Sequence, residues 1–158
     1  MTAKQILDII SANMTIEQFA YGDFELPDNM DFLPEKELSE WNDYNLKYNA
    51  YKNHPGYSSN GARNEEFELL KQAYYNTKID FEKFTKLWLE YLGIGEIEEV
   101  EQYGGEGLGD SWYSVKYFKD HDIYIRTDGY YTSYNGTDFE QGYGNQVFKK
   151  EKTITVYE

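Results

Sequence analysis

Three adjacent residues in the second half of the chain, Asp120, His121 and Asp122, are of types that ligate metals. A calcium-binding loop places its ligands at alternating positions over about twelve residues and closes on a bidentate glutamate. The residues around Asp120 do not follow that pattern. Asp and His are also common in tight turns between strands, and we expect such a turn here. The sequence therefore predicts no metal site and no cofactor.

The glycine-rich run at residues 104–109 (GGEGLG) has the composition of a phosphate-binding loop. Such a loop continues into Gly-Lys-Ser/Thr or opens a helix, whereas this run leads into a predicted strand. No lysine or arginine lies between Lys86 and Lys116, and the seven acidic residues in that interval would repel a phosphate. Two interpretations remain, a flexible loop between strands and an acidic mobile loop that docks on a basic partner.

Hydrolytic chemistry has weak support in the sequence. Ser111 or Ser133 with His121 and an aspartate could form a nucleophilic triad, but the Gly-x-Ser-x-Gly pattern is absent. Carboxylates are so numerous that a pair of them does not indicate general acid–base chemistry, which also needs one carboxyl with a raised pKa. We therefore predict that the protein is not an enzyme.

The charge balance limits the classes of partner. The 158 residues include 29 acidic and 15 basic side chains, a formal net charge of -14, which argues against direct binding to nucleic acid. The absence of cysteine excludes disulfides, thiolate metal sites and a cysteine nucleophile. No apolar run reaches the ~20 residues of a transmembrane helix, and the first residues lack the basic start and apolar core of a secretory signal. We expect a cytoplasmic protein without membrane contact.

The first half of the chain has the apolar spacing of helices. Helices are expected at residues 4–12, from Thr15 to Gly22, at 35–51 after Pro34, at 64–76, and from Asp80 to Gly93. One face of the last helix carries four aromatic residues that we expect in the core, namely Phe81, Phe84, Trp88 and Tyr91.

After Gly93 the apolar period changes toward two, which is typical of strands. Strands are expected at residues 94–103, 112–118, 123–125 and 153–157. Hairpin turns are expected at the Asp-Gly of 128–129 and the Asn-Gly of 135–136, with the run 130–134 between them. Within 112–118, Tyr113, Val115 and Tyr117 share one face, and Trp112, Ser114 and Phe118 share the other. The sequence thus predicts an α+β fold in a single domain, residues 1–158, with N-terminal helices (1–92) packed on a C-terminal antiparallel β-meander (93–158).

Four runs in the second half resemble a known group of proteins. They are residues 103–113 (YGGEGLGDSWY), 118–125 (FKDHDIYI), 128–136 (DGYYTSYNG) and 151–158 (EKTITVYE). Over about residues 100–158 the chain is similar to small, largely uncharacterised acidic proteins of tailed bacteriophages. The resemblance implies a phage origin, and therefore the cytoplasm of an infected bacterium, and it supplies no catalytic residues.

Acidic residues gather in two tracts that are candidates for partner binding. Carboxylates spaced along a rigid surface can imitate nucleic-acid phosphates and gain the same electrostatic attraction to a cationic groove, while aromatic side chains supply anchors. The first tract comprises Glu17, Asp23, Glu25, Asp28, Asp31, Glu35, Glu37, Glu40 and Asp43, with Trp41 as an aromatic anchor, and the second comprises Glu98, Glu99, Glu101, Glu106 and Asp110.

Three functions remain open on these observations. The first is an acidic phage protein that binds a host or phage protein with a basic surface, and so inhibits or diverts a nucleic-acid-handling or defence protein. The second is a phage structural or assembly accessory protein. The third is a binder of a small molecule such as a nucleotide signal, which predicts a closed pocket lined by tyrosines and Arg126. Solubility alone is also a sufficient reason for excess acid.

Overall fold

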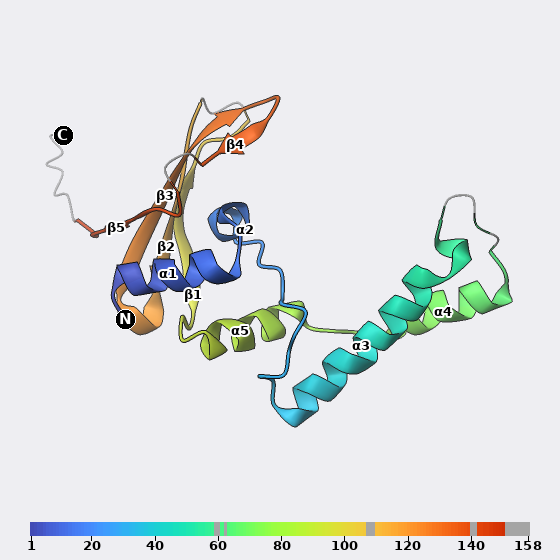
Figure 1. The fold of residues 1–158 in the computed structure, drawn as a ribbon. Helices are drawn as coiled ribbons and strands as arrows, with labels where there is room; N and C mark the ends of the chain where they lie inside the picture. Colours follow the sequence, from blue (N-terminus) through green and yellow to red (C-terminus); the bar gives the residue numbers. More distant parts are fainter. Residues whose placement is uncertain (59–60, 62, 107–109, 140–141, 151–158) are drawn as a thin grey trace, which may run out of the picture. The chain divides into compact units, whose positions relative to one another are not determined.

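The computed structural model describes residues 1–58, 61, 63–106, 110–139 and 142–150, and it confirms the α+β class (Figure 1). Helices occupy the first part of the chain and antiparallel strands the second. The chain divides into two compact units, unit 1 (Met1–Glu25 with Leu89–Glu158) and unit 2 (Leu26–Trp88). A single domain over 1–158 stays a prediction, and each unit is described by itself.

Unit 1 begins with two short helices, α1 (Ala3–Asn13) and α2 (Ile16–Tyr21). Each starts with a capping box. The hydroxyl of the N-cap threonine, Thr2 or Thr15, accepts a hydrogen bond from the backbone N–H three residues on. The glutamine side chain at that position accepts a second one from the backbone N–H of the threonine. α2 ends at Gly22, whose φ of 72° is the left-handed conformation that glycine adopts without strain. The predicted start and end of α2 are thus confirmed.

The sheet of unit 1 is an antiparallel meander in the order β1-β2-β3-β4. Its strands are β1 (Ile97–Tyr103), β2 (Ser111–Phe118), β3 (Ile123–Thr132) and β4 (Gly136–Asp138), and β5 (Asn145–Val147) pairs with the first half of β3. Between β2 and β3 lies a 3-10 turn, η2 (Lys119–His121), followed by Asp122 at φ 51°. This confirms the turn expected at Asp120–Asp122, whereas the strand expected at 153–157 lies outside the described residues.

The hairpin turn expected at Asp128-Gly129 is wrong, because both residues lie inside β3. Gly129 pairs with Trp112 across the sheet, and a Cβ added to it would lie 2.5 Å from Cγ2 of Thr137 and 3.1 Å from Cδ1 of Phe139. The glycine is therefore needed for close packing and not for a turn. The hairpin expected at Asn135-Gly136 is present, and it joins β3 to β4.

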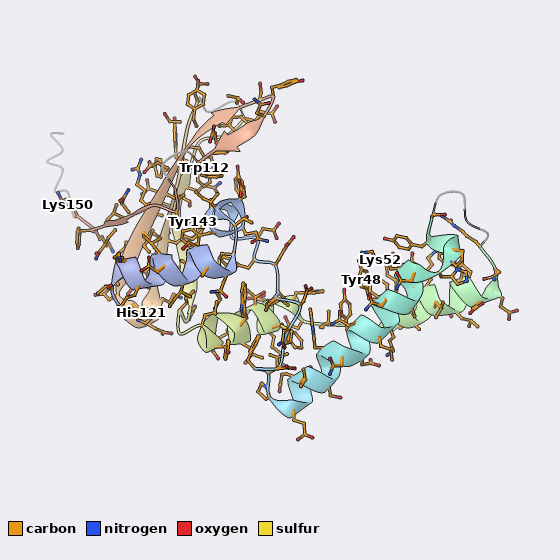
Figure 2. The ribbon with its side chains drawn as sticks, in the orientation of Figure 1. Tyr48, Lys52, Trp112, His121, Tyr143 and Lys150 are labelled. Carbon is orange, nitrogen blue, oxygen red and sulfur yellow. The ribbon has the colours of Figure 1, made fainter. Side chains whose placement is uncertain are left out.

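One face of the sheet is covered by α1 and α2 (Figure 1). Ring centroids of Phe19 and Phe118 lie 6.3 Å apart, and the Tyr21 ring lies edge-on to Trp112, which Figure 2 labels beside α2. Ser114 Oγ and Lys116 Nζ both donate to the carbonyl of Ala20 at the end of α2, at 3.2 and 2.9 Å. The predicted face of Trp112, Ser114 and Phe118 is confirmed, with buried Lys116 as an unexpected member.

Unit 2 is built on a helical hairpin of α3 (Glu35–Asn53) and α4 (Glu65–Asn76), with η1 (Pro55–Tyr57) between them. No α3 residue is buried, and the contact is made by half-buried rings such as Tyr51 and Tyr74, which stack at 5.5 Å. Figure 2 labels Tyr48 and Lys52 on α3, where the Lys52 ammonium lies 5.2 Å from the Tyr48 ring centroid. Aromatic contacts therefore replace an aliphatic core in this hairpin.

The next helix, α5 (Phe81–Tyr91), begins in unit 2 and ends in unit 1. Its Phe84 packs with Met30 and Leu33 in a buried cluster of unit 2. Phe84 and Trp88 are buried as expected, but Phe81 and Tyr91 are 48% and 66% exposed, so the expectation that all four aromatics are core is wrong. Phe81 and Tyr91 are the first and last residues of α5 and lie at the two edges of the stripe, whereas Phe84 and Trp88 lie at its centre.

Unit 2 should lose stability at alkaline pH. Burial and the hydrogen bond to Tyr74 raise the pKa of Tyr44 above its ordinary value of 10. Because the folded state holds the neutral phenol, this contribution is complete below pH 10 and is lost as the pH rises through the folded pKa. We expect the free energy of unfolding in urea to fall between pH 9 and about pH 11. The fall should be smaller in Tyr44→Phe, whereas Tyr134→Phe, at a 95% exposed position, should behave as the wild type.

Candidate binding surface on the open face of the sheet

Successive side chains of a strand point to opposite faces of the sheet. In β1, β2 and β3, every second side chain therefore points away from the face that α1 and α2 cover. Strand register groups them on one surface, called here the open face. A bulge between Glu99 and Glu101 shifts β1 by one residue, so that Glu101 faces the same side as its partner Val115. The open face comprises Glu98, Glu101, Tyr103, Tyr113, Val115, Tyr117, Tyr124, Arg126 and Asp128.

Tyrosines form two stacked pairs across the strands of the open face. Tyr103 and Tyr113 stack with ring centroids 5.8 Å apart at 25°, and Tyr117 and Tyr124 stack at 4.4 Å and 18°. All four rings are half-buried or exposed, although Val115 between them is buried. Tyrosines in this state present an apolar ring and a polar hydroxyl, which is the combination enriched in protein interfaces.

The guanidinium of Arg126 lies over one of these rings. Its guanidinium carbon is 3.9 Å from the Tyr113 ring centroid, while Nε and Nη2 lie 2.8 and 2.7 Å from Oδ1 of Asp128. The hydrogen bond to Asp128 raises the pKa of Arg126 above its ordinary value. Tyr113 Oη in turn donates to Oε1 of Glu101 at 2.5 Å, which raises the pKa of Tyr113. At neutral pH the open face therefore holds a fixed arginine between fixed carboxylates.

Two hollows flank Arg126. One of about 620 Å³ is lined by Tyr113, Arg126, Asp128 and Tyr130 among others. Another of about 500 Å³ is lined by Glu101, Val115, Tyr124, Arg126, Val147 and the lysines at 149 and 150, of which Figure 2 labels Lys150. The Arg126 side chain is 40% exposed, so both hollows open to solvent at this residue. The surface is thus hollowed on both sides of Arg126.

The carboxylates of the second acidic tract all lie on or next to this sheet, but they do not share one face of it. Glu98 and Glu101 belong to the open face, whereas Glu99 turns to the helix side and binds Lys116 Nζ at 3.0 Å. Glu106 and Asp110 are exposed in the connection between β1 and β2. Glu98 pairs with Lys119 Nζ at 3.1 Å. Two of the five predicted carboxylates therefore share the open face with the tyrosine pairs.

The first acidic tract is divided between the two units. Glu17, Asp23 and Glu25 are exposed in unit 1, and the remaining members belong to unit 2. In unit 2, Asp28, Asp31 and Glu35 are exposed, and the other carboxylates are paired within the unit: Glu37 and Glu40 with Lys83 at 3.0 and 3.2 Å, and Asp43 with Lys47 at 2.6 Å.

Trp41, the aromatic anchor expected for the first tract, packs inside unit 2. Its ring centroid lies 5.5 Å from that of Phe84 and 5.9 Å from that of Tyr44, and its side chain is half-buried. Carboxylates of the open face are instead accompanied by Tyr103, Tyr113, Tyr117 and Tyr124. The sequence signal for two of them was the alternation of Tyr113, Val115 and Tyr117 in one strand.

Comparisons with known proteins return no match to a protein-family model, to a curated protein or to a solved structure. Within the described ranges, no group of three or more histidine, aspartate and glutamate side chains is arranged to hold a metal ion. Asp120 and Asp122 instead flank His121, whose Nε2 lies 2.9 Å from the carbonyl of Gly93. No helix in the described part of the chain is long and apolar enough to cross a membrane.

Proposed function

We propose that this protein is a non-catalytic binding protein that recognises a basic surface of another protein through its open face. The observation that carries the proposal is the placement of Glu98 and Glu101 beside the two stacked tyrosine pairs. By its resemblance to phage proteins, we propose that it acts in the cytoplasm of an infected bacterium. There it would inhibit or divert a nucleic-acid-handling or defence protein, with its carboxylates in the place of phosphates.

Fixed carboxylates favour tight binding to cations. Glu101 is held by the Tyr113 hydroxyl and Glu98 by Lys119, so little side-chain entropy remains to be lost when a partner binds. Each carboxylate still has exposed surface, and neither is enclosed by its internal partner. These groups are therefore placed to meet a lysine or arginine of a second protein without a large ordering cost.

Charge and rings contribute different parts of the proposed interaction. A net charge of -14 accelerates encounter with a cationic surface, and this attraction weakens as salt screens it over a Debye length of ~8–10 Å. Affinity after encounter comes from desolvated anchors, most often Tyr, Trp and Arg. The open face supplies four tyrosines and Arg126 for this role.

The proposal predicts that neutralising two open-face carboxylates removes the partner. Tagged wild type and Glu98→Gln/Glu101→Gln should be used to capture proteins from a lysate of the bacterial host at about 50 mM and about 300 mM salt, with mass spectrometry as the readout. We expect the wild type to retain a protein with a cationic surface at the lower salt and to lose most of it at the higher. The variant should lose it at both.

The matched control is Glu82→Gln/Glu90→Gln, which removes the same charge from exposed positions on α5. It should retain the partner as the wild type does. Equal loss in both variants would mean that binding follows net charge alone, and full retention by Glu98→Gln/Glu101→Gln would contradict the open-face proposal. Asp28→Asn/Asp31→Asn, run in parallel, tests whether the exposed acids of unit 2 contribute.

A small-molecule ligand is the second candidate, because Tyr113, Tyr130 and Arg126 line the 620 Å³ hollow. The hollow is not closed, and Asp128 and Asp138 in its lining oppose a phosphate. A nucleotide ligand would raise the melting temperature of the wild type in proportion to the logarithm of its concentration. No change with a panel of nucleotides at 1 mM or higher, which is ~100-fold above a Kd of ~10 µM, would remove this candidate.

A further inference from the structure

The two tyrosine pairs of the open face have similar surroundings but differ in one respect. In the first pair, Tyr113 donates to Glu101 and carries the Arg126 guanidinium over its ring. In the second pair, Tyr117 Oη donates to Oδ1 of Asp122 at 3.1 Å, and Glu98 lies opposite Tyr117 in the neighbouring strand. No cation of the described residues lies over Tyr117 or Tyr124. The second pair thus has the rings and the carboxylates but no guanidinium.

The first pair shows how a tyrosine ring and a carboxylate together bind a guanidinium. A guanidinium stacks on an aromatic face through cation–π attraction, and a carboxylate at its edge fixes its orientation through hydrogen bonds. Arg126 uses both, since Tyr113 lies beneath it and Asp128 binds two of its nitrogens. An ammonium is also attracted by the ring and by the carboxylate. Because it is not planar, it cannot stack on the ring or form two parallel hydrogen bonds with the carboxylate.

Acidic residues outnumber basic groups on the Tyr117 side of the second pair. The acids Glu96, Glu98, Asp120 and Asp122 lie on β1, at its start, or in the turn after β2. The cations near them are Lys119 and the N-terminal ammonium, which lies 3.3 Å from Nδ1 of His121, whereas Lys149 and Lys150 line the hollow on the Tyr124 side. Lys119 binds Glu96 and Glu98 at 2.7 and 3.1 Å, whereas Asp122 accepts from the Tyr117 hydroxyl. The Asp122 carboxylate is held at the Tyr117 hydroxyl, and the Asp122 backbone is in the left-handed conformation.

We propose that the Tyr117–Tyr124 pair, with Asp122 at its edge, receives an arginine side chain of the partner protein in the way that Tyr113 receives Arg126. The inference rests on the proposed function and specifies the partner, whose contact surface must present an arginine and not only positive charge. A second copy of this chain is an unsuitable occupant, because two chains of charge -14 repel one another.

The test uses two labelled peptides of equal charge, acetyl-Arg-Thr-Arg-Thr-Arg-amide and its lysine counterpart, titrated with the full chain at about 50 mM salt in fluorescence anisotropy. We expect the wild type to bind the arginine peptide about fivefold more tightly than the lysine peptide, equivalent to about 1 kcal/mol. In Tyr117→Leu/Tyr124→Leu this ratio should fall to about one. Tyr75→Leu/Tyr134→Leu, at exposed positions outside the open face, should keep the wild-type ratio.

Asp122→Asn tests the same site without removing a ring, and asparagine tolerates the left-handed backbone of this position. It should lower the affinity for the arginine peptide more than that for the lysine peptide. Absence of peptide binding, equal binding of both peptides by the wild type, or an unchanged ratio in these variants would overturn the inference. If the expected difference in affinity between the two peptides is absent while Glu98→Gln/Glu101→Gln still loses the captured partner, only the arginine site is wrong and the proposed function stands.

Discussion

Phe118→Ala should destabilise the protein by about 3–5 kcal/mol, the largest effect that we expect from a single substitution. Phe118 is fully buried at the end of β2, where its ring lies 6.3 Å from that of Phe19 on α2. Removing it takes away the transfer free energy of the ring and leaves a cavity between helix and sheet. The measurement is the free energy of unfolding from urea titration followed by circular dichroism.

The matched control is Phe148→Ala, which truncates the same side chain at a position that is 74% exposed. Its free energy of unfolding should stay within ~0.5 kcal/mol of the wild type. A Phe118→Ala variant as stable as the wild type would mean that α2 does not pack on the sheet as described.

Lys116→Met should cost about 2–4 kcal/mol, the second largest effect. Its ammonium is buried with two hydrogen bonds, to the Ala20 carbonyl at 2.9 Å and to Glu99 at 3.0 Å. Methionine preserves most of the apolar contact, but it leaves the Glu99 carboxylate without its partner and the Ala20 carbonyl with Ser114 Oγ as its remaining side-chain donor. Because Glu99 is 38% exposed and can be hydrated in part, the cost should stay below that of a fully buried unpaired charge.

A double-mutant cycle with Glu99→Gln measures the interaction between the two side chains. We expect a coupling free energy of about 1–3 kcal/mol. Glu99→Gln should lower partner capture only as far as it lowers the fraction of folded protein. A coupling near zero would mean that the Lys116–Glu99 pair does not stabilise the fold, and loss of capture by folded Glu99→Gln would mean that Glu99 is a partner-binding residue.

Local signals in the sequence were sufficient to predict most of the helices. Thr15 caps α2, Asn64 caps α4 and Asp80 binds the N–H of Lys83 at the start of α5, each through a side chain a few residues away. At the end of α5, Gly93 adopts φ 74° at the position where the sequence predicts the helix to end, and Ile94 donates to the carbonyl of Leu89. Such contacts involve neighbours in sequence, so residue type and spacing are enough to identify them.

Tertiary packing decided the features that the sequence did not reveal. Asp128-Gly129 has the composition of a turn, but β3 continues through it because a glycine is needed beside Thr137. Lys116 lies in the buried face although lysine is rarely buried, since the end of α2 and Glu99 supply its partners. Neither cause can be read from the neighbouring residues in the chain.

The candidate site was predicted only in part for the same reason. Residues 17–43 form a continuous acidic tract in sequence, but the chain passes from unit 1 to unit 2 after Glu25. Trp41 has the type of an interface anchor and is used inside unit 2 instead. The alternation in β2 indicated a shared face for Tyr113 and Tyr117, whereas the bulge that turns Glu101 toward them depends on how β1 pairs.

The central claim, that the open face contacts a basic protein, is tested most directly by site-specific photo-crosslinking in the bacterial host. A photoreactive phenylalanine analogue is placed at Tyr103 or Tyr117 on the open face, and at Tyr134 or Tyr75 as exposed controls in unit 1 and unit 2. We predict crosslinks from both open-face positions to one protein with a cationic surface, and none to that protein from the controls. Crosslinks to the partner from Tyr134 or Tyr75 alone would contradict the account.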